Sequence, residues 1–330
     1  MMAEFGGGLF CRSHTDAIKG IAILFVMLGH TNIIPYAGAY GVVLFLMLSG
    51  FGLVQSYFAT GLDGFFSKRL SKVLIPYTVI TVIWLMALGH SAISSGDYYQ
   101  LFTIVFGLDS KATLDPTMWY VTYVIIWYVA FYFIFSANSH HIIKILFLFL
   151  FSYYLYNNAS IFTGDSGAGL YVTAFPIGAA WGMVFYKTKH YSINKKYLLS
   201  GCFVFSVAAL YASINFYQNI SAVFFDYAAT NVSCALLVVG ITSFLSILGV
   251  NFGVFEFFGK LSYEIYLIEG VFLMRFFGVL DVLPTHYMKV FAFIFIVTVA
   301  AYIFRLLLSF TMKNISKAAS KWLLNNRAVN

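Results

Sequence analysis

The sequence predicts an all-helical protein that crosses a membrane about ten times. Sixty-one per cent of its 330 residues are hydrophobic and only 9% are charged, and the mean hydropathy is +0.87. A soluble core of this size could not bury so much apolar surface, whereas apolar runs of about 20 residues span a bilayer as helices. We therefore expect one integral membrane domain over residues 1–330, an all-α bundle with a short tail at each end.

The apolar runs, separated by polar and glycine-containing breaks, define the individual spans. They lie near residues 17–34, 38–58, 73–90, 118–136, 142–157, 168–186, 198–215, 228–248, 256–277 and 288–311. The fifth run is short, and it follows the fourth closely. A count of nine or eleven spans therefore remains open.

The charges alternate from one connection to the next. The two tails and every second connection carry basic residues: Arg12, Lys68, Arg69, Lys72, Lys144, Lys187, Lys189, Lys195, Lys196, Lys260, Lys313, Lys317, Lys321 and Arg327. The other connections carry Asp97, Asp109, Asp115, Asp165, Asp226 and Asp281, with Lys111 and Lys289 as their basic residues. Because basic connections stay in the cytoplasm, both termini are predicted to be cytoplasmic. We assign the net charge of +7 to this topology and expect no nucleic-acid partner.

The first span contains two ionisable residues, Lys19 and His30. They are 11 positions apart, so they project from one helix face about 16 Å apart along the axis. This places Lys19 near the cytoplasmic entrance and His30 roughly 20 Å into the helix, past the bilayer midplane. A buried ionisable group is costly in a membrane and indicates function, and a neutral imidazole can take a proton from a hydroxyl. The alternative is a histidine that only packs.

The second span contains small residues, Ser49 and Gly50, within Phe45-Leu-Met-Leu-Ser-Gly-Phe-Gly52. Small side chains let helices approach closely, or they leave space for a thin ligand chain. Helix packing is the simpler of these two interpretations.

The connection over residues 66–77 carries three cations in five positions, Lys68, Arg69 and Lys72. Lysine and arginine donate charge-assisted hydrogen bonds to phosphate oxygens, so this connection fits a phosphate-bearing ligand. The alternative is topological, because cytoplasmic connections are basic and contact lipid headgroups. Pro76 is predicted to lie in the first turn of the next helix.

The ninth span carries two carboxylates, Glu264 and Glu269, and it ends near Arg275. Two carboxylates in an apolar span need partners. Arg305 in the tenth span lies at the depth of Glu264, which predicts a structural pair. Glu269 lies at the predicted depth of His30, which it could orient or charge.

Five motifs follow one another in the order found in the acyltransferase-3 family of integral membrane acyltransferases, and residues 14 to 310 resemble that family. They are Lys19-x10-His30, Phe45-Leu-Met-Leu-Ser49-Gly50-Phe51, Lys68-Arg69-x2-Lys72-x3-Pro76-Tyr77, Trp119-Tyr-Val-Thr-Tyr-x4-Tyr128 and Gly259-Lys260-Leu-Ser262-Tyr263-x2-Tyr266-Leu267. The resemblance implies transfer of an acyl group, most often acetyl from acetyl-CoA, to a hydroxyl of a sugar or exported glycan. It also implies a bacterial inner-membrane protein that takes its donor from the cytoplasm.

The resemblance and the positions of the residues together assign roles, that of Glu269 resting on its predicted depth. The catalytic residues would be His30 and Glu269, the donor site would be Lys19, Lys68, Arg69, Lys72, Ser49 and Gly50, and the acceptor site would be Trp119, Tyr123 and Arg275. We expect no metal. The expected partners are acyl-CoA, a sugar, glycolipid or exopolysaccharide acceptor, the lipid bilayer and glycan-assembly proteins. This chain has Lys19 where family members often have arginine, and Glu269 where many have histidine.

A different class of protein, a proton-coupled transporter or glycan flippase, would use His30, Glu269 and Arg275 as a proton relay. Such a protein is expected to have two related halves with broken helices at the midplane. The sequence contains no convincing internal repeat of that kind.

Overall fold

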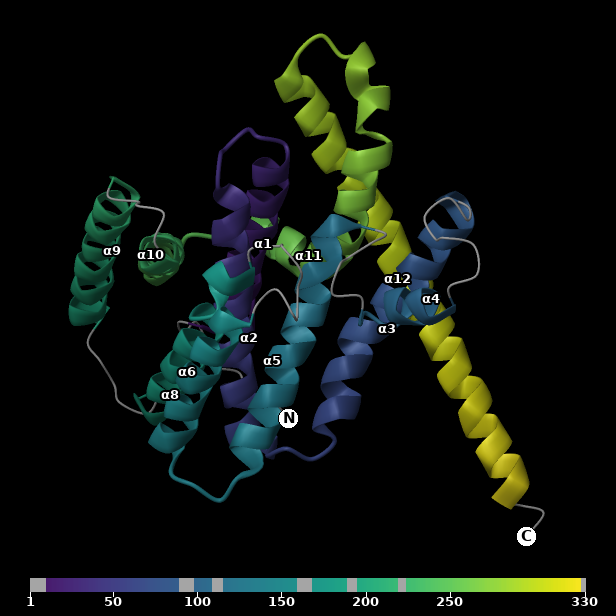
Figure 1. Ribbon diagram of the computed structural model, residues 1–330, viewed down its shortest axis with the longest axis horizontal. Helices are drawn as coiled ribbons and strands as arrows, with labels where there is room; N and C mark the ends of the chain where they lie inside the picture. Colours follow the sequence, from purple (N-terminus) through teal and green to yellow (C-terminus); the bar gives the residue numbers. More distant parts are fainter. Residues whose placement is uncertain are drawn as a thin grey trace. The chain divides into compact units, whose positions relative to one another are not determined.

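Every regular element of the described chain is a helix, which confirms the all-helical prediction (Figure 1). The structure is a computed structural model that describes residues 10–88, 98–108, 115–158, 168–188, 195–218 and 224–327. Its α-helices are α1 (Arg12–His30), α2 (Ala37–Thr60), α3 (Phe65–Leu88), α4 (Tyr98–Val105), α5 (Trp119–Ser136), α6 (His141–Asn157), α8 (Ala174–Thr188), α9 (Lys195–Gln218), α10 (Phe224–Ile247), α11 (Gly253–Arg275) and α12 (His286–Arg327). The 3-10 helices are η2 (Pro116–Met118), η3 (Ala168–Tyr171) and η4 (Phe277–Val282).

Each of the ten predicted spans overlaps a helix, and seven described segments are long and apolar enough to cross a membrane. These are Ala37–Thr60, Phe65–Ala87, Pro116–Ser136, Gly169–Thr188, Lys196–Asn215, Ala229–Ile247 and His286–Asn314. Helix α6 is apolar but shorter, and α1 and α11 are not among the seven. The count of ten and the position of the termini therefore stay predictions. Asp97, Asp109, Lys111, Asp165 and Lys189, which contribute to the predicted orientation, lie outside the described residues.

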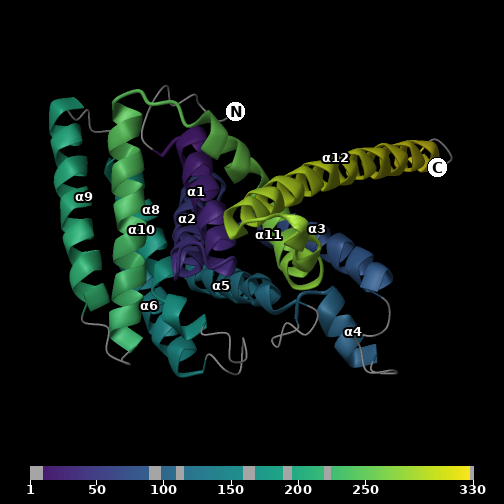
Figure 2. The ribbon, with the colours of Figure 1, turned by 90° about the horizontal axis from the view of Figure 1, so that it is seen from above.

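The chain forms two compact units, residues 1–260 and residues 261–330, and the boundary falls within α11. In the first unit, α2 packs against both α1 and α8, and α9 packs against α10 (Figures 1 and 2). In the second unit, η4 packs against α12, a helix of 42 residues. The prediction of a single domain is not tested by this division.

Glycines allow the helices of the first unit to touch backbone to backbone. A Cβ atom at Gly41 of α2 would collide with the Ala22 carbonyl of α1, and one at Gly178 of α8 would collide with Met47 of α2. Gly20 of α1 meets the Phe255 carbonyl at the start of α11 in the same way. Small residues are the usual solution where helices associate in a membrane, because they let backbones approach closely.

Helix α3 begins earlier than the sequence predicts. The segment 66–77, expected as a connection, lies inside this helix, so Lys68 and Lys72 share one face at a spacing of four residues. Pro76 is the twelfth residue of α3 and not part of its first turn, which corrects the prediction. A proline inside a membrane helix is tolerated when neighbouring groups satisfy the freed backbone carbonyl.

Candidate active site

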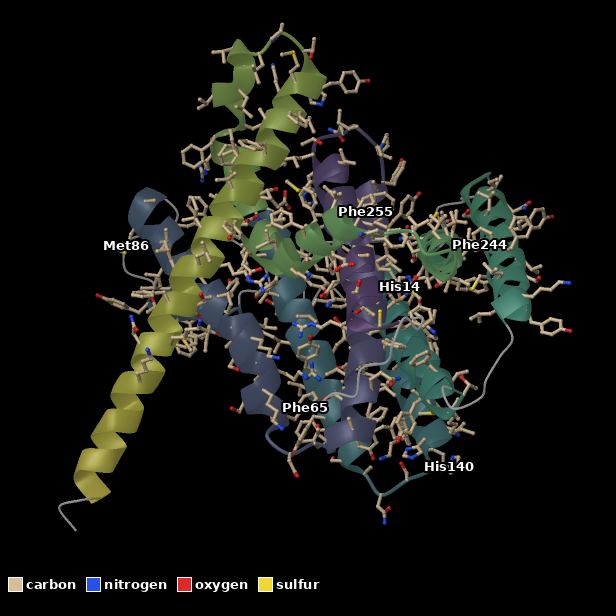
Figure 3. The ribbon with its side chains drawn as sticks, turned by 180° about the vertical axis from the view of Figure 1, so that it is seen from behind. His14, Phe65, Met86, His140, Phe244 and Phe255 are labelled. Carbon is tan, nitrogen blue, oxygen red and sulfur yellow. The ribbon has the colours of Figure 1, made fainter. Side chains whose placement is uncertain are left out.

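The three predicted phosphate-binding cations lie together in the first two turns of α3. Lys68 and Lys72 are exposed, and Arg69 is half-buried. The Lys68 Nζ atom donates to the Asp63 carbonyl at 2.8 Å, so this side chain leans back over the turn that precedes the helix. Figure 3 shows α3 running from Phe65, at the lower end of the picture, up to Met86. The cations therefore mark the end of the bundle at which α2 finishes and α3 begins.

A polar path leads from Arg69 into the interior of the first unit. Arg69 interacts electrostatically with Tyr128 of α5, and the Ser49 side chain of α2 lies within hydrogen-bonding reach of both Tyr128 and Tyr120. Tyr120 and Tyr128 are eight residues apart, about 12 Å along α5. Helices α2 and α5 therefore contribute hydroxyl groups near one another, and α3 contributes the Arg69 guanidinium group, which acts on Tyr128 through its charge.

Ser49 and Gly50 face different neighbours, although they are adjacent in the sequence. Gly50 is buried against α8, where a Cβ atom would collide with the Phe175 carbonyl and lie 2.8 Å from the Ala179 nitrogen. Gly50 is therefore a helix-packing residue, the simpler of the two predicted roles. Ser49 instead faces the tyrosines of α5.

Lys19 is held by a neighbour on its own helix. Its Nζ atom lies 3.1 Å from Asp16 Oδ1, and the Arg12 guanidinium lies 3.9 Å from the other carboxylate oxygen. The Asp16 side chain is 8% exposed and that of Lys19 is 38% exposed. Asp16 therefore offers a mostly buried negative charge to two cations that are more exposed.

His30 is the last residue of α1 and is exposed, which corrects the prediction that it lies deep within a continuous helix. The helix ends here because residues 31–36 form a tight connection in which Asn32 and Tyr36 have positive φ angles of 56° and 64°. The His30 ring faces α2, since its Cδ2 atom lies 3.9 Å from the place a Cβ atom of Gly38 would take. Along α2, Gly38 and Ser49 are 11 residues apart, about 16 Å.

The predicted acceptor residues of α5 belong to an aromatic cluster. Trp119 is half-buried and stacks on Tyr171 with the ring centroids 5.6 Å apart, and the ring of Tyr123 lies tilted to that of Trp119 at 5.7 Å. Tyr123 is 1% exposed and lies against Trp127. Of the two, Trp119 is the one with an accessible surface.

The remaining predicted residues, Glu269 and Arg275, lie in the second unit. Glu269 is completely buried, and Arg275 is the exposed last residue of α11. Glu264 interacts electrostatically with Arg305 of α12, in agreement with the predicted pair. His30 and Glu269 belong to different units, so their pairing stays a prediction.

These features define a helical, polytopic membrane protein with cations at one end of its first unit and an exposed histidine near the opposite end of α2. The acyltransferase-3 family model, described as an acyltransferase domain, matches residues 14–309. The chain therefore belongs to the acyltransferase-3 family, and this family implies an acyltransferase. Neither the curated proteins nor the solved structures compared with the chain include a significant match.

Two residues of the polar path, Tyr120 and Tyr128, received no role from the sequence. Their spacing of eight residues places them on one face of a helix, which is a usable signal. In an aromatic-rich helix this signal cannot be separated from ordinary packing. Their shared neighbour, Ser49, distinguishes them from the other aromatic residues of α5.

Proposed function

We propose that this protein transfers an acyl group, acetyl in the first instance, from cytoplasmic acyl-CoA to a hydroxyl of a sugar or cell-surface glycan in a bacterial inner membrane. The observation that carries the proposal is the family match over residues 14–309. The polar path from Arg69 through Tyr128 to Ser49 supports it, because this path offers a route from a cationic end into the bundle.

The donor would bind at the start of α3. The phosphates of coenzyme A carry several negative charges, which Lys68, Arg69 and Lys72 would neutralise through charge-assisted hydrogen bonds. The pantetheine arm would then extend beside Ser49, with the thioester directed toward His30. Lys19, with its ammonium group next to Asp16, would lie along the same route.

His30 would act as the general base. Its neutral imidazole takes the proton of the acceptor hydroxyl, and the oxygen attacks the carbonyl carbon of the thioester. The carbon–sulfur bond then breaks, coenzyme A leaves as a thiolate, and the proton held by His30 is available to it. The acyl group passes either directly to the acceptor or through a relay on the enzyme.

Glu269 would stabilise the imidazolium that forms on His30 during this step. Trp119, which is half-buried and stacked on Tyr171, is suited to hold a sugar ring, with Tyr123 behind it and Arg275 as a further polar contact. An aromatic ring offers a sugar an apolar face of matching size.

The proposal is tested with the purified full-length protein, labelled acetyl-CoA and a panel of candidate glycans, by measuring label transferred to glycan. We expect transfer by the wild type and a loss of about 10²- to 10⁴-fold in His30→Ala, the usual cost of removing a general base. Ile34→Ala, an exposed residue of the same connection, is the matched control and should retain activity. Activity of His30→Ala within a few-fold of the wild type would exclude His30 as the base.

A further inference from the structure

A second group of basic side chains lies where α2 and α8 end and α6 begins. His141 interacts electrostatically with Lys144, with His140 and with Lys187, the last of these near the end of α8. In Figure 3, both His140 and Phe65 lie at the lower end of the picture. This group, His140, His141, Lys144 and Lys187, is called the α6 basic cluster below. It shares no residue with the proposed donor site.

One member of the α6 basic cluster, Lys144, stabilises the fold. Its side chain is 3% exposed, and its Nζ atom donates to the Phe135 carbonyl at 2.8 Å and to the Tyr57 hydroxyl at 3.1 Å. The ammonium group also lies 5.1 Å from the centre of the Tyr57 ring. Lys144 therefore binds the end of α5 to α2, and it adds a fixed positive charge beneath the other members.

His141 is held in place by aromatic rings. It meets Phe58 edge to face with the centroids 5.0 Å apart, and Phe58 in turn stacks on Tyr186 at 4.1 Å with the planes 8° apart. Within the described residues, the buried Nδ1 atom of His141 has no hydrogen-bond partner. The imidazole is thus oriented by packing at the start of α6, next to the end of α8.

The charge at this place is unbalanced. His141 interacts with three basic residues, and the first turn of α6 adds the partial positive charge of a helix N-terminus. The positive charges of Lys144 and Lys187 attract an anion to this place. The ligand that fits this cluster therefore carries negative charge.

Apolar surface continues directly from the cluster. Ile142, Leu146 and Leu150 follow one another at four-residue intervals along α6 and are 55%, 56% and 62% exposed. On α8, Val184 is 60% exposed one turn before Lys187.

A ligand that satisfies both surfaces has an anionic head and hydrocarbon tails. We propose that the α6 basic cluster is a binding site for an anionic phospholipid, whose phosphate contacts His141 and Lys187 and whose acyl chains lie along α6 and α8. Basic pockets between membrane helices commonly bind such headgroups.

The test measures lipid retention by native mass spectrometry on the purified full-length protein, titrated with phosphatidylglycerol, with cardiolipin and, separately, with phosphatidylcholine. We expect the two anionic lipids to bind preferentially. His141→Asn/Lys187→Ala should weaken this binding by about tenfold or more, since basic groups near a membrane surface attract anionic headgroups. The matched control, Lys313→Ala/Lys317→Ala, removes two exposed lysines of α12 and should bind as the wild type does.

Three outcomes would overturn the proposal. One is equal binding of phosphatidylcholine, and another is an equal loss in the α12 control, which would indicate unspecific charge. The third is full competition by glycerol phosphate or inorganic phosphate, which would indicate a site for a free phosphate. The melting temperature without lipid reports folding of each variant. If the double variant is unstable, Lys187→Ala alone serves, because this side chain is exposed.

Discussion

At the scale of single residues, the two histidines of α1 differ in environment. His30, at the end of the helix, is exposed, whereas His14, near its beginning, is 3% exposed. The Nδ1 atom of His14 accepts a hydrogen bond from the Phe10 amide at 3.1 Å, and its ring stacks on that of Phe10. Phe10 also meets Trp181 of α8 edge to face. His14 therefore helps to fix the chain just before α1 against the bundle.

Burial of His14 predicts a pH dependence of stability. Burial lowers the pKa of His14 from 6.5 to about 4, so between these values the unfolded chain binds the proton and the folded chain does not. The stability due to a neutral His14 is complete above pH 6.5 and is lost as the pH falls toward 4, by about 3 kcal/mol in total. His14→Asn, which keeps an acceptor for Phe10 but does not titrate, should melt with a smaller dependence on pH between 7 and 4.5.

The sequence identifies chemically important residues better than it places them. His30 stands out because an imidazole near an apolar run is rare, and it lies within the residues that the family model matches. The predicted end of its helix, near residue 34, was wrong because the connection after His30, Thr31–Tyr36, contains the apolar residues Ile33, Ile34 and Pro35. The positive φ angles that end the helix produce no hydropathy signal.

At the scale of elements, α3 carries the three cations assigned to the donor. Changing Lys68, Arg69 and Lys72 together to glutamine should weaken acyl-CoA binding by at least about tenfold, since one hydrogen bond to a charged group contributes about 1.5 kcal/mol or more. Isothermal titration with acyl-CoA measures this, and the KM for the acceptor should change less. The control is the α12 pair, Lys313→Gln/Lys317→Gln. If the triple variant binds acyl-CoA with unchanged affinity, the α3 cations only set the orientation of the chain in the membrane.

The contact between α2 and α8 is tested by two glycines of one helix. Gly50→Ala would force the backbones of α2 and α8 apart, because the added Cβ atom collides with the Phe175 carbonyl, whereas a Cβ atom at Gly52 meets nothing within 4 Å. We expect Gly50→Ala to lower the melting temperature by several degrees, and Gly52→Ala to leave it equal or higher, since alanine favours a helix. Equal melting temperatures would contradict tight packing at Gly50.

The existence of most helices could be predicted, but their ends could not. Hydropathy located a helix for every predicted span, because a bilayer requires long apolar runs. The start of α3 was missed since Lys68, Arg69 and Lys72 interrupt the apolar run without interrupting the helix. A charge near a helix end can extend to water along its flexible stem, so hydropathy underestimates the length of such helices.

At the scale of the whole molecule, the two residues proposed as catalytic belong to different units, His30 to the first and Glu269 to the second. If Glu269 stabilises the protonated form of His30, Glu269→Gln should slow transfer and move the acidic limb of the pH–rate profile to lower pH. Glu264→Gln is the matched control, because that carboxylate interacts with Arg305. A shift of the same size in both variants would rule out a specific role for Glu269.

The family could be predicted from the sequence, and so could the part of the chain that belongs to it. The resemblance covers residues 14 to 310, and the family model matches residues 14–309. The order of the motifs along ten apolar runs is a property of the whole chain. This order therefore identifies the family better than any single motif does. The count of ten spans stays a prediction, because α1 and α11 carry charged residues within their helices and are not among the seven candidate spans.

The contact of Gly20 with the start of α11 has a consequence for biosynthesis. Gly20 and Gly259 meet backbone to backbone, although about 240 residues separate them. At roughly 5–20 residues per second, the ribosome needs about 10 to 50 s to deliver the second glycine after the first. During this interval the nascent α1 lacks one of its packing surfaces and depends on α2, which follows at once and already provides the Gly41 contact. Ribosome stalling before residue 253 would thus leave α1 open to quality-control proteases in the membrane.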